Sequence, residues 1–352
     1  MTPERLRTSD FEYHLPLELI AQEPSPDRGD SRLLVVRRPM AEYVQPDPSL
    51  QDAQFADLTG LIPPGDLVVL NTTRVRHARL LGSRPSGAPA EVLLVQPAER
   101  GAWVAIGKPG SALRPGRQII LGPDASVETA EVLPDGSRLV RFVGISAEEA
   151  MRQYGRLPLP PYIERPSNEM DEVRYQTVYA AVEGSVAAPT AGLHFTPGLL
   201  DRLTSAGVHV EGLDLQVGTG TFQPVEVDDP AQHEMHPEAY EISPRLADLI
   251  DQVQVRGHSV WAVGTTVVRA LESAARPNGS VQSGPGETRL MIMPGYRFRV
   301  VDRLVTNFHL PRSTLLMLVS ALAGRELVMA AYRHAVGARY RFYSYGDAMV
   351  II

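Results

Sequence analysis

The sequence contains no cysteine and a single lysine, Lys108, in 352 residues. The absence of cysteine excludes disulfides, thiolate-bound zinc and iron–sulfur clusters. The chain has no run of eighteen apolar residues, so we expect no membrane-spanning helix. Its first ten residues lack the apolar segment of a secretory signal. With 43% hydrophobic and 21% charged residues, the composition is typical of a globular protein, and a cytoplasmic location is expected by default.

The charge of the chain is unevenly distributed. The net charge of −7 disfavours a nucleic-acid partner. However, residues 289–345 contain nine arginines and two acids, a net charge of +7 that leaves −14 for the rest. Eight aromatic residues are interleaved with these arginines, as is typical of phosphate contacts combined with base stacking. A structural lobe with a solvated arginine face would explain the same composition, and on composition alone this explanation is favoured.

Two kinds of secondary-structure pattern occur along the chain. From residue 71 to about 146, short β-branched runs are separated by proline- and glycine-rich turns, including the hairpin signal Asp135-Gly136. This spacing predicts a small barrel or sandwich. Elsewhere, predicted strands alternate with helices, which indicates a layered α/β domain. We therefore predict an α/β main domain, residues 1–70 and 151–352, with an inserted small all-β barrel domain, residues 71–150.

Two glycine-containing segments follow predicted strands. Gly264-Thr265-Thr266 leads into a helix, where free N–H groups and threonine hydroxyls suit a carboxylate or phosphate. A simple N-cap role for either threonine explains the segment equally well. Gly218-Thr-Gly220 suggests a nucleotide-binding loop, but the following residues 223–230 cannot begin a helix well. A close-packed turn beside a pocket is the favoured interpretation.

Four histidines lie in segments that could carry chemistry. His233-Glu-Met-His236 has metal-ligand residue types, but its spacing beside Pro237 and the lack of a third histidine favour a polar substrate-binding loop, and no metal site is expected. His194 lies in an irregular small-residue segment before a capped helix, and His309 lies just before an apolar helix. Each is a candidate acid or base, and each is explained equally well as a packed core residue.

Several motifs spread along the chain occur together in one known family. The most specific are Gly184-Ser-Val-Ala-Ala-Pro-Thr-Ala-Gly-Leu-His-Phe-Thr196 and Tyr340-Arg-Phe-Tyr-Ser-Tyr-Gly-Asp-Ala-Met349. Others are Asp10-Phe-Glu-Tyr-His-Leu-Pro16, Asp27-Arg28, Ser31-Arg32-Leu33, Asn71-Thr-Thr-Arg-Val75, Gly220-Thr-Phe222, Ala262-Val-Gly-Thr-Thr266 and Thr306-Asn-Phe-His-Leu-Pro311. Through them the chain resembles the S-adenosylmethionine:tRNA ribosyltransferase-isomerases of queuosine biosynthesis. That family usually has aspartate at the position of Thr72 and histidine at that of Gln216.

The resemblance implies a fold, a reaction and partners. The fold is an α/β domain with an inserted β-barrel, in agreement with the pattern above. The reaction transfers the ribosyl group of S-adenosylmethionine to 7-aminomethyl-7-deazaguanine at the tRNA wobble position and rearranges it to an epoxycyclopentanediol. Adenine and methionine leave, and the product is epoxyqueuosine-tRNA. No cofactor is implied beyond S-adenosylmethionine, which is consumed as a substrate. We expect a monomer with no membrane partner.

The implied chemistry needs a base for the C5′ hydrogens that the sulfonium acidifies, an acid for the departing adenine, and an unprotonated amine. Our first candidate for proton transfer is His194, followed by His309 and Asp347. The tRNA phosphates are assigned to Arg339 and Arg341. The candidate substrate-binding residues are Thr190, Gly192, Gly218, Gly220, Phe222, His233, His236, Gly264, Thr265, Thr266, Arg269, Asn307, Tyr343 and Tyr345. Among them, a tyrosine could face the sulfonium or stack on adenine.

The sequence leaves two alternatives open. Gln216 motivates a non-catalytic tRNA-binding relative, and Gly218-Thr-Gly220 motivates an ordinary S-adenosylmethionine methyltransferase. The products distinguish these alternatives, because the transferase-isomerase releases adenine and methionine, the non-catalytic relative releases nothing, and a methyltransferase releases S-adenosylhomocysteine.

Overall fold

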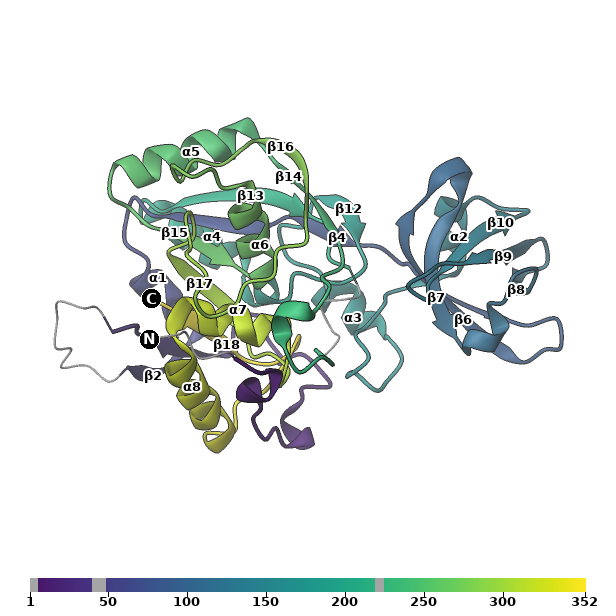
Figure 1. Cartoon of the computed structure of the whole chain (residues 1–352), viewed down its shortest axis with the longest axis horizontal. Helices are drawn as coiled ribbons and strands as arrows, with labels where there is room; N and C mark the ends of the chain where they lie inside the picture. Colours follow the sequence, from purple (N-terminus) through teal and green to yellow (C-terminus); the bar gives the residue numbers. More distant parts are fainter. Residues whose placement is uncertain (1–5, 40–48, 219–224) are drawn as a thin grey trace.

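The computed structural model describes residues 6–39, 49–218 and 225–352. In this part of the chain, a large α/β body contains the central sheet, and a smaller β-rich body projects from one side of it (Figure 1). The carboxyl end lies on the large body, away from the projecting one.

The central sheet has nine strands. Its order is β16 (Gly284–Thr288), β14 (Glu238–Ile242), β13 (His209–Leu215), β3 (Leu67–Asn71), β15 (Val260–Val263), β17 (Arg303–Asn307), β18 (Ala348–Ile351), β1 (Arg32–Val36) and β2 (Leu50–Gln54). The four strands from β13 to β17 are parallel, whereas β18 lies antiparallel to β17 and parallel to β1. The strand β18 therefore lies inside the sheet, between β17 and β1. This agrees with the expectation that the polar, aromatic tail must pack against the protein to be ordered.

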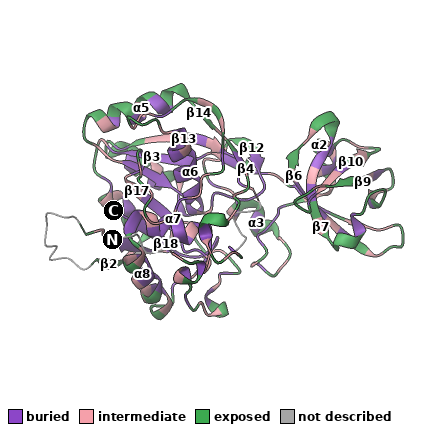
Figure 2. Ribbon diagram, viewed as in Figure 1, coloured by how far each residue is buried: buried purple, intermediate pink, exposed green. Residues whose placement is uncertain are grey.

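Helices cover both faces of this sheet. On β3, Leu67 and Val69 pack with α5 (Pro244–Val255), α6 (Thr265–Ala274), α7 (Thr314–Ala323) and α8 (Arg325–Gly337). Val68 and Leu70 face the other way, toward α1 (Leu58–Leu61) and α4 (Pro197–Ser205). Successive side chains of a strand point to opposite faces, so a strand covered on both sides reads as a continuous apolar run. The central strands and α6 are accordingly buried in Figure 2, and the layered α/β prediction is confirmed.

Helix α7 illustrates how the local sequence fixes an element of this core. Ser313 caps its start by accepting a hydrogen bond from Leu316 N, and Gly324, with φ of 88°, ends it. The helix is apolar on nearly all sides, as is typical of a fully buried helix. Of the helices in the described residues, none alone is long and apolar enough to cross a membrane. Within the described ranges, only α7 and α8 taken together meet those criteria, and they are bent by 116°.

The projecting body is a seven-stranded antiparallel sheet with its own apolar core. Its order is β11 (Gly155–Arg156), β5 (Arg79–Ser83), β6 (Pro89–Pro97), β7 (Trp103–Lys108), β10 (Arg138–Val143), β9 (Ala125–Val132) and β8 (Gln118–Gly122). β5 also pairs with β8, through Ser83 and Ile120. The predicted turn at Asp135-Gly136 joins β9 to β10. A barrel in the strict sense remains a prediction.

The inserted block differs from the predicted all-β domain in two respects. It contains helix α2 (Ala147–Tyr154), which begins inside the predicted range 71–150 and packs on the core of this body. Strand pairing also crosses both predicted limits. At the start, β4 (Thr73–Val75) pairs with β12 (Val182–Ser185) outside the block, and at the end β11 pairs with β5 inside it. The division of the chain at residues 71 and 150 remains a prediction.

Candidate active site

A pocket lies at the carboxyl ends of β15 and β17. Ligands of open α/β sheets commonly bind at this edge of the parallel strands. The pocket walls come from the segments at 188–191, 264–266, 306–310 and 343–344, together with Tyr162, Val217 and two residues at the start of α7. The sequence-predicted residues that line it are Thr190, Gly264, Thr265, Thr266, Asn307, His309 and Tyr343.

The start of α6 forms one wall of the pocket. Gly264, with φ of 93°, is the N-cap and provides no side-chain cap, so the alternative in which Thr265 or Thr266 is the N-cap is wrong. The two threonines are instead the first residues of the helix, and their backbone N–H groups have no intrahelical partner by geometry. The Thr266 hydroxyl is buried and has no hydrogen-bond partner among the described residues. This wall can therefore hold an anionic or hydrogen-bonding group.

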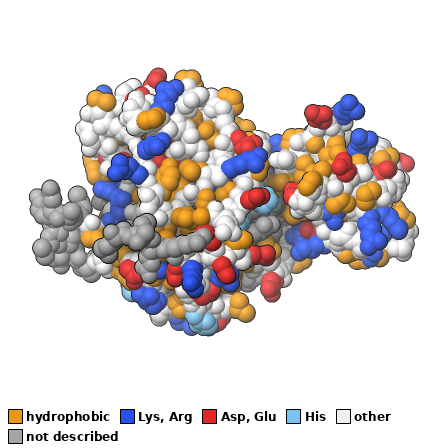
Figure 3. Space-filling view, viewed as in Figure 1, with side chains coloured by type: hydrophobic (Ala, Val, Ile, Leu, Met, Phe, Trp, Pro, Cys, Tyr) orange, Lys and Arg blue, Asp and Glu red, His pale blue; other side chains and the backbone are white. Residues whose placement is uncertain are grey.

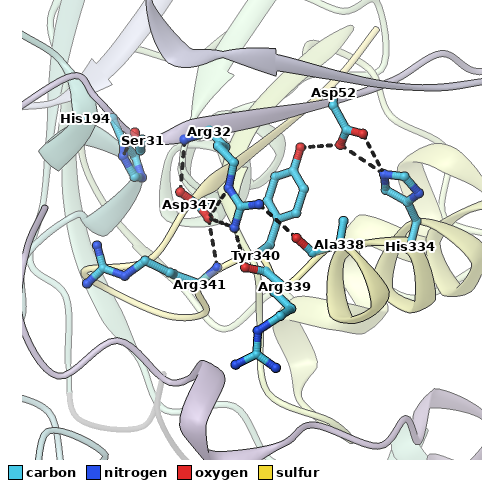
Figure 4. Close-up of polar contacts among 10 residues, drawn as sticks. All are labelled: Ser31, Arg32, Asp52, His194, His334, Ala338, Arg339, Tyr340, Arg341 and Asp347. Carbon is cyan, nitrogen blue, oxygen red and sulfur yellow. Dashed lines mark hydrogen bonds and ion pairs between the residues drawn. The ribbon is translucent and has the colours of Figure 1, made fainter.

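His194 lies behind the pocket wall rather than in it. It ends the 3-10 helix Thr190–His194, directly before the capped helix α4, and only 5% of its surface is exposed. Its Nε2 lies 3.1 Å from Asn307 Nδ2, and its Nδ1 lies 2.7 Å from Ser31 Oγ. Figure 4 draws His194 beside Ser31. An amide nitrogen can only donate, so Nε2 must accept and the ring proton is on Nδ1, which donates to Ser31. Burial lowers the pKa of His194 to about 4, which keeps this ring neutral.

Asn307 is held by two partners at the end of β17. Its Nδ2 also donates to the carbonyl of Tyr343, at 2.9 Å. Because this carbonyl can only accept, the amide orientation is fixed, with the nitrogen toward Tyr343 and His194. The Asn307 Oδ1 is buried and has no partner among the described residues. An unpaired buried acceptor is costly, so a bound ligand that donates a hydrogen bond here would be favoured.

His309 is the histidine that lines the pocket. Its Nε2 lies 2.8 Å from Thr306 Oγ1, and its backbone N–H donates to Tyr332 Oη at 2.9 Å. None of the described residues hydrogen-bonds its Nδ1. Burial lowers the pKa of His309 to about 3, so the imidazole is neutral at physiological pH. A neutral imidazole with one nitrogen anchored and the other uncommitted can accept a proton from a ligand.

Asp347 lines no part of this pocket. Its buried carboxylate accepts from the backbone N–H of Arg32 at 2.9 Å and of Arg341 at 2.8 Å, and it forms an ion pair with the Arg32 guanidinium at 2.9 Å (Figure 4). The Arg32 guanidinium also lies 4.1 Å from the centre of the Tyr340 ring. These contacts fasten the C-terminal tail to β1, and they leave the carboxylate fully engaged with the protein.

The other predicted site residues are distributed around the pocket. Tyr345 lines a neighbouring hollow and donates to Asp171 Oδ1 at 2.7 Å. Gly192 packs against Tyr179, where a side chain would collide with the tyrosine. Arg269 forms a buried ion pair with Glu238 and lines neither hollow.

The loop after β13 was also predicted to bind substrate. Gly218 N donates to Glu238 Oε1 at 3.2 Å, and Gly220 and Phe222 lie outside the described residues. His233 and His236 line neither hollow, and His236 is exposed. No group of three potential metal ligands occurs within the described ranges.

The two departures from the family pattern lie away from the pocket lining. Gln216 is exposed and lines neither hollow. The Thr72 hydroxyl lies 2.5 Å from the Asp214 carboxylate on β13. Sequence reasoning missed Ser31 and Thr306, which orient the two histidines, although both lie in motifs that were recognised. It also missed Tyr162, whose ring centre lies 4.6 Å from that of Tyr343, and for this residue the sequence carries no local signal.

Comparison with known proteins covers nearly the entire chain. The family model described as queuosine biosynthesis protein matches residues 8–351. A relative from Cupriavidus pinatubonensis is 52% identical over 98% of this chain and 99% of its own. A relative from Symbiobacterium thermophilum is 51% identical over 99% of this chain and 100% of its own. Both are named S-adenosylmethionine:tRNA ribosyltransferase-isomerase. The crystal structure of an S-adenosylmethionine tRNA ribosyltransferase from Thermotoga maritima is similar, with 35% identity, a TM-score of 0.56, and coverage of 98% of this chain and 100% of that one.

Proposed function

The chain belongs to the queuosine biosynthesis family, and from that premise we propose that the pocket at the carboxyl ends of β15 and β17 is where S-adenosylmethionine reacts with tRNA. The activity is transfer and isomerisation of the ribosyl group of S-adenosylmethionine onto 7-aminomethyl-7-deazaguanine at the wobble position. The products are epoxyqueuosine-tRNA, adenine and methionine. S-adenosylmethionine is a consumed substrate, and no further cofactor is proposed. A cytoplasmic location and a monomeric state remain predictions.

The observation that carries the location of the site is a set of uncommitted polar groups that meet in one pocket. Thr266 Oγ1 and Asn307 Oδ1 are buried without partners among the described residues, and His309 Nδ1 is not hydrogen-bonded by any of them. Buried polar groups are normally paired, so an unpaired set at one strand edge indicates a ligand that completes it. S-adenosylmethionine offers both donors and acceptors, because it carries an ammonium, a carboxylate, ribose hydroxyls and an adenine amine.

The pocket suggests how S-adenosylmethionine is oriented. The methionine carboxylate fits the start of α6, where backbone N–H groups and the Thr266 hydroxyl can donate to it. The sulfonium fits beside Tyr343 and Tyr162, because a cation is attracted to the face of an aromatic ring. Asn307 Oδ1 then accepts from a hydroxyl or amine of the nucleoside.

We assign proton abstraction at C5′ to His309 rather than to His194. When His309 Nε2–H donates to Thr306 Oγ1, the Nδ1 lone pair is available, and the proton moves from C5′ to Nδ1 while its electron pair stays on the carbon beside the sulfonium. His194 has both ring nitrogens engaged, with Ser31 and Asn307. It therefore acts as a positioning residue that orients the Asn307 amide.

The test is incubation with S-adenosylmethionine and tRNA that carries the aminomethyl base, followed by mass spectrometry of small molecules and nucleosides. We expect adenine and methionine to be released only with the modified tRNA, and the same tRNA with an unmodified guanine is the matched control. Detection of S-adenosylhomocysteine would instead support the methyltransferase alternative. Absence of any product would support the non-catalytic relative.

A further inference from the structure

A second hollow adjoins the active-site pocket. The two share Ser344, which lines both. His194 borders the second hollow and hydrogen-bonds to Asn307, which lines the first. A ligand group in the second hollow would therefore lie next to the reacting part of S-adenosylmethionine.

Two arginines give this second hollow a positive charge. Arg28 and Arg174 both line it, and no carboxylate does. Neither arginine forms an ion pair with the described residues. The buried carboxylate of Asp171 is engaged by Arg165 and Tyr345. Burial and the charge of Arg174 lower the pKa of Arg28, as expected for two close cations without a counter-ion.

Both guanidinium groups are held in place by backbone carbonyls. Arg28 Nη1 donates to Leu193 O and its Nη2 to Val173 O, each at 2.9 Å, and Arg174 Nη1 donates to Pro26 O at 2.9 Å. These neutral acceptors orient the two groups without cancelling their charge. A pair of fixed, uncompensated guanidinium groups beside a hollow is well suited to an oxyanion, which arginine can bind through two parallel hydrogen bonds.

We propose that Arg28 and Arg174 bind a backbone phosphodiester of the tRNA substrate beside the wobble nucleotide. This inference rests on the proposed function, since it assumes that tRNA enters the adjoining pocket. We have assigned the methionine carboxylate, the other oxyanion in the reaction, to the start of α6. On the face drawn in Figure 3, basic and acidic side chains are interspersed over both bodies, and the net charge is −7. A local pair of cations is therefore needed to hold phosphate near the reacting base.

The experiment measures the affinity of the full-length protein for modified tRNA as a function of salt concentration. Arg28→Gln and Arg174→Gln should each flatten the slope of log Kd against log salt by about 0.7 for one lost contact to single-stranded RNA. Arg28→Lys and Arg174→Lys should retain the slope, because the charge is kept. Arg245→Gln is the matched control, because Arg245 lies on α5, has an 82% exposed side chain and lines neither hollow.

Three results would overturn the inference. The slope could be unchanged in both glutamine variants. The glutamine variants could weaken S-adenosylmethionine binding in the absence of tRNA while tRNA binding stays normal, which would make the oxyanion the methionine carboxylate. The lysine and glutamine variants could all show a lower melting temperature and a lower tRNA affinity, which would mean that the two arginines stabilise the fold through their hydrogen bonds to backbone carbonyls. Failure of the wild-type protein to release adenine would contradict the proposed function, whereas normal release with unchanged slopes would contradict this inference alone.

Discussion

Replacing His309 with glutamine is the most direct test of the proposed chemistry. The amide is close to imidazole in size and can still bond to Thr306, but it cannot take up a proton near neutral pH. Removal of a general base typically lowers the rate by about 100- to 10,000-fold, which corresponds to about 3–5 kcal/mol in the barrier. The binding of S-adenosylmethionine loses at most one neutral hydrogen bond, worth about 1 kcal/mol. His309→Gln should therefore reduce the rate far more than the affinity.

The assay is single-turnover adenine release at saturating S-adenosylmethionine and modified tRNA, with the dissociation constant and melting temperature measured on the same preparation. His334→Gln is a suitable control, because His334 pairs with Asp52 on the surface and lines neither hollow. His194→Gln should reduce the rate less than His309→Gln and should also weaken S-adenosylmethionine binding, since it disturbs the Asn307 amide. Our assignment would be refuted if the His309→Gln variant folds and reacts at a near-normal rate while the His194→Gln variant binds normally but is inactive. His194 would then be the base.

Three further predictions concern stability and tRNA binding. Lowering the pH from 7 to 5 should reduce the free energy of unfolding by about 2 kcal/mol for each of the buried residues His194 and His309. Their pKa values in the folded protein, about 4 and about 3, lie below the unfolded value of about 6.5. Between pH 7 and pH 5, therefore, only the unfolded chain takes up protons at these histidines. Urea unfolding at both pH values measures this, and His194→Gln should remove about half of the loss. Asp347→Ala should lower the free energy of unfolding by about 2 kcal/mol, a value reduced to allow for the partial exposure of Arg32. The affinity for S-adenosylmethionine should change little. A variant that is stable but inactive would instead indicate that Asp347 takes part in the reaction. Arg339→Ala, at an exposed position, should flatten the salt dependence of tRNA affinity by about one unit if it contacts phosphate, and an unchanged slope would place the tRNA backbone elsewhere.

The sequence predicted most of the fold because the signals involved are local. Continuous apolar runs such as that of β3 indicated strands buried on both faces, and the caps at Ser313 and Thr196 placed the starts of α7 and α4. Turn residues indicated the β-rich insertion. Composition alone could not predict the pairing of β4 with β12, because this pairing joins residues about a hundred positions apart.

The sequence also determined which segments form the candidate active site, since the recognised motifs contain most of the pocket lining. It could not determine which histidine lines the pocket, because His194 and His309 lie in equally polar motifs. Only the tertiary structure brings Ser31 and Asn307 to the two ring nitrogens of His194, from which they are 163 and 113 residues away in the chain. It also leaves one ring nitrogen of His309 without a hydrogen bond to the described residues. The role of a titratable side chain depends on its hydrogen-bond partners and its burial, and folding brings those partners together from distant parts of the chain.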